Sequence, residues 1–126
     1  MLKQSILEQS DIDKIEKIER DFMMVHGTFT GMESEPYDLF LKFMNVTMKD
    51  GSVSKMYKEL IAVGISVFFN CEPCTSWHVR EAMKSGATDK QIMETIEVAG
   101  EMGGGPVFAR CGFAIKLVEY LKDKLK

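Results

Sequence analysis

The sequence predicts an all-α protein made of one domain, residues 1–126, with about six helices. Three observations support this fold class. Apolar residues recur every three or four positions over most of the chain, which is the period of an amphipathic helix. No stretch alternates apolar and polar residues as a half-buried strand would. Glycine, proline and capping residues divide the chain into segments of helical length, and 45% of the residues are apolar, which is enough for a core.

The first two helices are predicted at residues 11–26 and 35–48. Gly27 is placed to end the first helix in a left-handed turn. The polar stretch 28–33 is then expected to form a short loop. Pro36 suits the first turn of the second helix, because the N–H that proline lacks would have no helical partner there.

The third helix is predicted to follow a cap at Ser52 or Ser54 and to run to Phe69. Residues 60–69 read LIAVGISVFF and are apolar on every side, which indicates a buried helix. These ten residues are too few to cross a bilayer, since a spanning helix needs about 20. Asn70 is predicted to break the helix.

The remaining helices are bounded by clear signals. The fourth is predicted at residues 73–84. Thr88 is expected to cap the fifth, because Gln91 follows three residues later in the capping-box pattern. The sequence GGGP at 103–106 cannot continue a helix, so a last helix is expected at about 107–125.

Two cysteines and a histidine lie where the fourth helix begins. Cys71 and Cys74 are three residues apart, so at a helix start both thiols share one face and are close enough to form a disulfide. The positive end of the helix favours a thiolate there. His78 follows Cys74 by four residues, which makes the two side chains neighbours, and an imidazole beside a thiol can act as its base.

Glu59 lies at the edge of the apolar stretch, where a carboxylate must find a partner or stay protonated. It can meet His78 only if the chain reverses near Asn70 in a hairpin of two helices. At roughly 1.5 Å per residue, Glu59 would lie about 16 Å and His78 about 10 Å from that break. A crossing angle or one bridging water would close the difference. The alternative for Glu59 is a surface salt bridge with Lys55 or Lys58.

Together these residues are similar to a known signature. Glu59, eleven intervening residues and then Cys71-x-x-Cys74-x-x-x-His78 resembles the pattern of the alkylhydroperoxidase D (AhpD-like) proteins of the carboxymuconolactone decarboxylase superfamily. The likeness covers about residues 37–121, and the chain looks like the single-repeat members. That family is all-helical and commonly forms trimers or hexamers, so the resemblance implies a homo-oligomer.

The resemblance also implies roles for the four residues. Cys74 would attack a small-molecule peroxide or disulfide, His78 would accept its proton, and Glu59 would assist through a relay that can include water. Cys71 would be the more accessible resolving thiol, closing a Cys71–Cys74 disulfide that an external dithiol or reductase reopens. No cofactor and no metal is expected. The sequence leaves open which reaction dominates and whether the pair is oxidised at rest.

Two other functions stay open. The first is a metal-binding or structural helical oligomer, in which zinc would use Cys71, Cys74 and His78 with Glu59 or Cys111 as the fourth ligand. The second is a carboxymuconolactone decarboxylase-like enzyme, although that branch does not use the cysteine pair.

Three neighbouring residues carry further expectations. Glu72 adds a negative charge between the cysteines, which opposes thiolate formation. Trp77 is expected to pack against the fold, and Cys111 is expected to be a small buried residue.

The net charge and the N-terminal residues bear on the partners and the location of the protein. The net charge of −3 gives no reason to expect nucleic acid or an anionic membrane as a partner. The opening residues contain no apolar signal-peptide segment, so we expect a cytoplasmic protein. Thiols are kept reduced in the cytoplasm, where a CxxC pair is more typical of a catalytic or metal site than of a structural staple.

Overall fold

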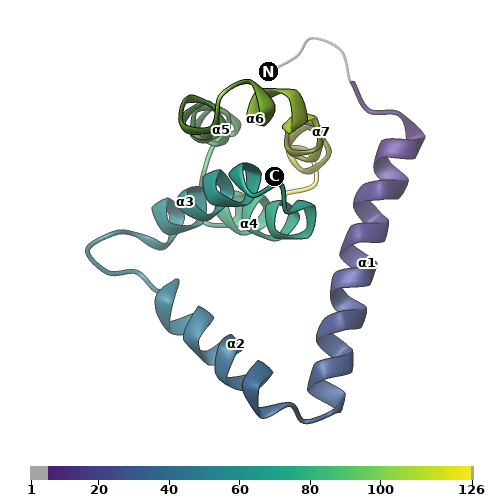
Figure 1. The fold of residues 1–126 in the computed structure, drawn as a ribbon, viewed down its shortest axis with the longest axis vertical. Coiled ribbons are helices and arrows are strands. Elements are labelled where there is room, and N and C mark those ends of the chain that lie inside the picture. Colours follow the sequence, from purple (N-terminus) through teal and green to yellow (C-terminus); the bar gives the residue numbers. More distant parts are fainter. Residues whose placement is uncertain (1–5, 126) are drawn as a thin grey trace.

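The computed structural model describes residues 6–125, which form seven α-helices and no strand (Figure 1). The all-α prediction is confirmed. Helices α3 to α7 pack into one body. Helix α1 contacts α4 and α7 and adds Ile15 to the core, and beyond these contacts α1 and α2 extend as two arms joined at their far ends (Figure 1). The helices are α1 Gln9–Gly31, α2 Glu35–Thr47, α3 Lys55–Phe68, α4 Glu72–Lys84, α5 Asp89–Gly103, α6 Gly105–Arg110 and α7 Gly112–Leu121.

Helix α1 runs further than predicted. It continues to Gly31, so the predicted end at Gly27 and the predicted loop at 28–33 are wrong. A glycine in a helix interior costs only about 1 kcal/mol relative to alanine, and a long helix absorbs that cost. The helix ends just before Glu33, whose φ of 55° lies in the left-handed region.

The predicted last helix is two helices, α6 and α7, separated at Cys111. The backbone N–H of Cys111 bonds to the carbonyl of Phe108, three residues back, so the regular helical ladder is interrupted there. Helix α7 ends at Leu121 and not near residue 125. The apolar spacing continues across the break, which is why the sequence pattern does not reveal it.

Two predicted helix starts are confirmed. The hydroxyl of Ser54 accepts a hydrogen bond from the backbone N–H of Tyr57 and caps α3. Thr88 and Gln91 form a reciprocal capping box at the start of α5. Both caps satisfy donors that the first helical turn leaves without partners.

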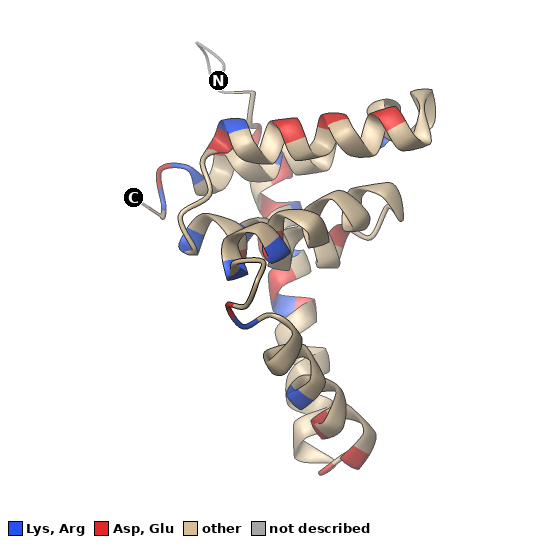
Figure 2. Ribbon diagram, turned by 90° about the vertical axis from the view of Figure 1, so that its left-hand side faces the viewer, with Lys and Arg blue, Asp and Glu red and all other residues tan. Residues whose placement is uncertain are grey.

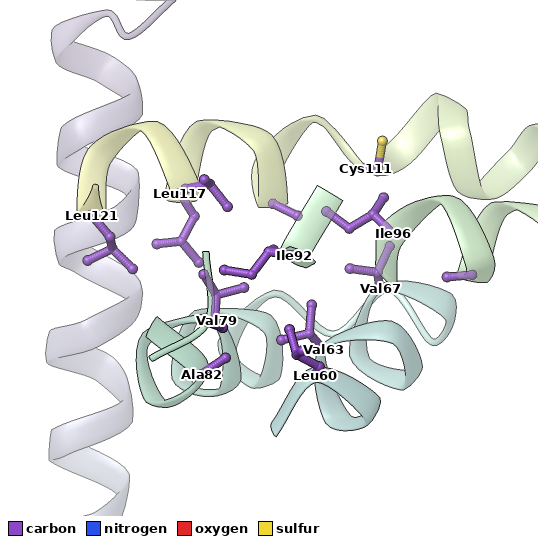
Figure 3. Packing of buried hydrophobic residues seen from close by; sticks show 14 of the residues in the cluster. Leu60, Val63, Val67, Val79, Ala82, Ile92, Ile96, Cys111, Leu117 and Leu121 are labelled. Atoms are coloured by element: carbon purple, nitrogen blue, oxygen red, sulfur yellow. The ribbon is translucent and has the colours of Figure 1, made fainter. Parts of the chain in front are cut away.

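The core lies between α3, α4, α5 and α7. Figure 3 shows Val63, Val79, Ile92 and Leu117, one from each of these helices, pointing into a common interior, and all four are fully buried. Burying a side chain of this size contributes about 1.5–3 kcal/mol relative to leaving it in water. This packing fixes α3 against α4, which is the relation that the candidate site requires.

Helix α3 is buried on one face only. Leu60 and Val63 face the core, whereas Ile61 and Ile65 on the opposite side are 55% and 52% exposed. The prediction that this stretch is buried on every side is therefore wrong for a single copy of the chain. No helix in the described part of the chain combines the length and the apolar character needed to cross a bilayer.

Candidate active site

The site is built on the reversal between α3 and α4. Asn70 has a φ of 58°, a left-handed conformation that asparagine adopts more readily than most residues. The backbone N–H of Cys71 then donates to the carbonyl of Ser66, 3.0 Å away, which closes the turn. The two helices pack against each other after this turn, so the predicted hairpin with its break at Asn70 is confirmed.

Cys71 and Cys74 are joined by a disulfide, with 2.03 Å between the sulfurs and 5.2 Å between the Cα atoms. Cys71 is the N-cap of α4, and its Sγ accepts a hydrogen bond from the backbone N–H of Cys74 at 3.3 Å. Once the disulfide is reduced, a thiolate at this position benefits from the same N–H and from the positive end of the helix.

The two cysteines differ in exposure. Cys74 is exposed, whereas Cys71 is half-buried. The expectation that Cys71 is the more accessible thiol is therefore wrong for this chain. The sulfur of Cys71 folds back to cap α4, and Cys71 also lines a cavity of about 10 Å³ together with Arg110 and Cys111.

Glu59 and His78 meet directly across the hairpin. The Nδ1 atom of His78 lies 2.7 Å from Oε2 of Glu59. The sequence predicted that Glu59 and His78 lie at different distances from the break at Asn70. A crossing angle between the helices or a bridging water was expected to close that difference. The direct contact shows that the packing of the helices closes it and that no bridging water is needed.

The protonation of this pair follows from its surroundings. Glu59 is 1% exposed, and burial alone would raise the pKa of its carboxyl. Hydrogen bonds from His78 and from Lys55, whose Nζ lies 3.2 Å from Oε1, outweigh burial and hold the pKa of Glu59 below its ordinary value. The carboxylate is therefore ionised at neutral pH and can only accept hydrogen bonds. The proton between the two residues must belong to Nδ1 of His78, so in the neutral form of the ring Nε2 carries the lone pair.

Cys74 and His78 lie one turn apart on α4, so their side chains share one face of the helix. His78 is partly exposed, at 21% of its side-chain area. An imidazole with Nδ1 held by a carboxylate and Nε2 free is the arrangement of an oriented general base. The spacing thus puts this imidazole one helical turn from Cys74, the exposed residue of the pair.

Charges around the cysteines are more balanced than the sequence indicated. The carboxylate of Glu72 forms an ion pair at 2.8 Å with Lys14 of α1, which offsets the negative charge between the thiols. Sequence reasoning missed Lys14, and no signal pointed to it, because the two residues are far apart in the chain. Trp77 stacks on Phe22 of α1 with ring centroids 5.4 Å apart, so its predicted packing role is confirmed.

The lysines near Glu59 separate into two kinds. Lys55 forms the ion pair offered as the alternative for Glu59, but the carboxylate is buried and bonds to His78 as well. Lys58 instead donates to the backbone carbonyls of Thr47 and Lys49. The four-residue spacing between Lys55 and Glu59 was the available signal, and it was interpreted as a surface contact only.

The ligand set for zinc is not assembled in this oxidised form. Across residues 6–125 no three His, Cys, Asp or Glu side chains are grouped so that they could share a metal ion. Cys111 is a buried free thiol, as expected, and its Sγ lies 3.3 Å from the carbonyl of Phe108.

Comparisons with known proteins agree with this architecture. A model of the carboxymuconolactone decarboxylase family matches residues 35–115. A protein from Paracoccus denitrificans called uncharacterized protein 4 in cox locus is 39% identical over 65% of this chain and 74% of its own length. An alkyl hydroperoxide reductase AhpD from Corynebacterium kroppenstedtii is 31% identical over 48% of this chain and 34% of its own.

A solved structure gives the same picture in three dimensions. The crystal structure of a carboxymuconolactone decarboxylase family protein from Legionella pneumophila superposes with a TM-score of 0.78 at 30% identity. The superposition covers 90% of this chain and 99% of that one.

Proposed function

Because the chain belongs to the carboxymuconolactone decarboxylase family, we propose that it is a thiol-dependent oxidoreductase that cycles Cys71 and Cys74 between dithiol and disulfide. The observation that carries the proposal is the hydrogen bond between Glu59 and His78 on the helix that bears this pair. Burying the charge of a carboxylate costs free energy. Here the buried carboxylate orients an imidazole that lies one helical turn from Cys74.

The reduced protein begins the reaction with a proton transfer. The Sγ–H proton of Cys74 moves to Nε2 of His78, and the carboxylate of Glu59 stabilises the imidazolium that forms. The thiolate attacks the terminal oxygen of a hydroperoxide, breaking the O–O bond, and the imidazolium proton goes to the departing alkoxide to give an alcohol. Cys74 is then a sulfenic acid, which condenses with the thiol of Cys71 to form the disulfide and one water.

A small disulfide can take the place of the peroxide. The Cys74 thiolate then attacks one sulfur, releases the first thiol and forms a mixed disulfide. Cys71 attacks Cys74 and releases the second thiol. The protein ends in the same Cys71–Cys74 disulfide by either route, so the site chemistry supports both substrates.

An external dithiol or reductase returns the protein to the dithiol state. Cys74, the more exposed residue of the pair, is the point of attack, and Cys71 is the leaving thiolate. A leaving thiolate departs faster when it is stabilised, and Cys71 keeps the N-cap hydrogen bond from Cys74. A pair that is reopened in every cycle suits a reducing compartment such as the cytoplasm.

We also propose that the protein acts as a homo-oligomer of the trimer or hexamer kind. Ten large apolar side chains on the two arms are exposed, and we call them the arm surface. No Asp, Glu, Lys or Arg occurs from Phe22 to Met32, and long stretches of the arms lack charged residues (Figure 2). The arm surface consists of Phe22, Met23, Met24, Val25, Phe29, Met32, Leu39, Phe40, Phe43 and Val46.

The same chain offers a surface that fits the arms. An apolar groove of about 810 Å³ runs between α3 and α5, lined among others by Ile61, Ile65 and Val98. Helix α2 buries no residue within its own chain, and a helix of this length is marginal without packing. At about 100 Å² for each half-exposed side chain, the arm surface amounts to roughly 1,000 Å², more than the approximately 800 Å² that each partner buries in a stable interface. A second copy covering arms and groove accounts for both surfaces.

Single serine substitutions of Cys71 and Cys74 test the proposed chemistry. With dithiothreitol as the electron donor, we expect Cys74→Ser to abolish turnover of an alkyl hydroperoxide because the attacking thiol is lost. We expect Cys71→Ser to slow it, because the donor must then reduce the Cys74 sulfenic acid directly. Cys111→Ser is the matched control, and it should retain turnover because Cys111 is outside the pair. Unchanged rates in both site variants would refute the redox function, and activity on a lactone substrate that survives both changes would favour the decarboxylase alternative.

A further inference from the structure

We propose that Lys55 is a positioning residue of this site: its ammonium group keeps Glu59 charged and thereby sets which ring nitrogen of His78 carries the proton. The link from that nitrogen to Cys74 rests on the proposed function, whereas the hydrogen-bond arrangement itself does not.

Lys55 is held at the mouth of the site by its backbone. It opens the first turn of α3, after the cap at Ser54, and its own N–H donates to Oδ1 of Asp50 at 2.7 Å. Its Nζ lies 3.2 Å from Oε1 of Glu59. The lysine side chain is 39% exposed and the glutamate side chain 2%, so Lys55 brings a positive charge from the solvent side to a buried carboxylate.

The two oxygens of Glu59 are shared between two donors. Oε1 faces Lys55 from the same helix, and Oε2 faces His78 from α4. These are the charged or titratable groups that act on Glu59 within residues 6–125. Both donors therefore offset the burial of this carboxylate, His78 more strongly than Lys55.

Removing the ammonium group of Lys55 should raise the pKa of Glu59. Burial raises the pKa of Glu59, and without Lys55 only His78 opposes it. A protonated Glu59 would donate to Nδ1 of His78, and the ring proton would then lie on Nε2. That nitrogen could no longer take the proton of Cys74. Lys55 thus controls the basic face of the imidazole without touching the sulfur.

The chain contains a matched ion pair that lacks this function. Lys17 and Asp21 have the same four-residue spacing and the same order along a helix, but their side chains are 67% and 56% exposed. An exposed pair of this kind has little influence on its surroundings. Lys17→Met therefore controls for the loss of one lysine charge and one helical ion pair.

The experiment compares Lys55→Met, Lys55→Arg and Lys17→Met with the wild type by two readouts. The first is the pH dependence of Cys74 alkylation by iodoacetamide in the reduced protein, with the modified residue identified by mass spectrometry. The second is the ¹⁵N NMR spectrum of the His78 ring in the oxidised protein, assigned with the aid of His26→Gln. The second readout requires no catalytic activity.

We expect the acidic limb of the alkylation profile to move up by about one pH unit in Lys55→Met. The direction follows because losing Lys55 raises the pKa of Glu59. Lys55→Arg should restore the wild-type profile, and Lys17→Met should match it. The NMR spectrum should show the Nδ1–H form of His78 in the wild type and a growing share of the Nε2–H form in Lys55→Met near neutral pH.

An unmoved profile together with an unchanged ring spectrum in Lys55→Met would overturn the proposal. If that variant does not fold, Lys55→Gln gives the same comparison, because it keeps a donor without the charge. An Nε2–H form of His78 in the neutral wild type would also overturn it. If Cys74→Ser kept full activity, the redox function would fail while the NMR prediction stayed in force, so the two failures are distinguishable.

Discussion

Glu59 and Glu72 are the two carboxylates of the α3–α4 hairpin site, and they have different roles because their surroundings differ. Glu59 is 1% exposed and held between Lys55 and His78. Glu72 pairs with Lys14 in a partly exposed position. A charge is felt most strongly where water is excluded, so Glu59 governs the imidazole, whereas Glu72 contributes only weakly to the local field.

Replacing Glu59 by glutamine keeps the shape of the side chain and removes its charge. The amide can donate to Nδ1 of His78, which would place the ring proton on Nε2 and block the base. We expect Glu59→Gln to slow the reaction of Cys74 with a hydroperoxide by about 100-fold or more, measured by stopped-flow fluorescence of Trp77, the single tryptophan. A rate within twofold of the wild type would show that the carboxylate does not orient the base.

The same substitution should change how the free energy of unfolding depends on pH. The pKa of Glu59 is lowered from its ordinary value of 4.5, so the unfolded state binds its proton more readily than the native state. The resulting stability is fully present above about pH 4.5 and is lost as the pH falls through the lowered value. Urea unfolding at pH 7 and pH 4 should show a smaller loss for Glu59→Gln than for the wild type. Equal losses in the two proteins would contradict this assignment.

At the residue scale, the sequence predicted which side chains the site brings together. The spacing of Glu59, Cys71, Cys74 and His78 predicted a hairpin site, and the structure joins the cysteines and bonds the glutamate to the histidine. The relative exposure of the two cysteines was not predictable in the same way. It depends on the N-cap role of Cys71, which turns that sulfur back over α4, and a motif spacing does not contain that information.

Among the elements, the turn between α3 and α4 carries the site because it fixes the register of Glu59 against His78. Asn70 makes this turn with a φ of 58°. Alanine in that conformation costs roughly 1–2 kcal/mol, whereas glycine adopts it freely.

Asn70→Ala is therefore expected to destabilise the protein by about 1 kcal/mol more than Asn70→Gly in urea unfolding. Both variants remove the same polar side chain, so the comparison isolates the backbone conformation. Indistinguishable unfolding midpoints would mean that the left-handed turn is not a constraint on the fold.

Element ends were predictable where a side chain acts locally. Ser54 and the pair Thr88–Gln91 mark helix starts because their side chains bond to the first turn. The end of α1 was misplaced at Gly27, since a glycine permits a left-handed turn without requiring one. The break at Cys111 left no trace in the apolar spacing, which continues from α6 into α7.

At the scale of the whole molecule, the two arms and the groove between α3 and α5 are surfaces that a single chain leaves uncovered. The stretch 60–69 was interpreted as buried on every side, but its residues Ile61, Ile65, Phe68 and Phe69 are exposed. A helix buried by a neighbouring copy has the same apolar pattern as one buried in its own core. Sequence periodicity cannot separate the two cases, whereas the structure of one chain can.

A charge introduced into the arm surface or into the groove should weaken the association between copies. Phe43→Glu on α2 and Ile61→Glu in the groove are each expected to weaken self-association by about 100-fold or more, because each would bury an unpaired carboxylate. Light scattering coupled to size-exclusion chromatography measures the mass. Asn45→Glu, an exposed polar position on α2, is the matched control and should leave the oligomer intact. A wild-type protein that is monomeric at micromolar concentration would contradict the assembly.

The most direct test of the proposed chemistry follows one turnover of the pair. Fully reduced protein is mixed with one equivalent of an alkyl hydroperoxide, quenched over time with an alkylating reagent and mapped by tandem mass spectrometry. We predict that a Cys71–Cys74 disulfide forms in near-stoichiometric amount while Cys111 stays a free thiol, and that His78→Gln reaches the same product about 100-fold more slowly. Disulfides through Cys111, or an equal rate in His78→Gln, would contradict the claim that this imidazole activates this pair.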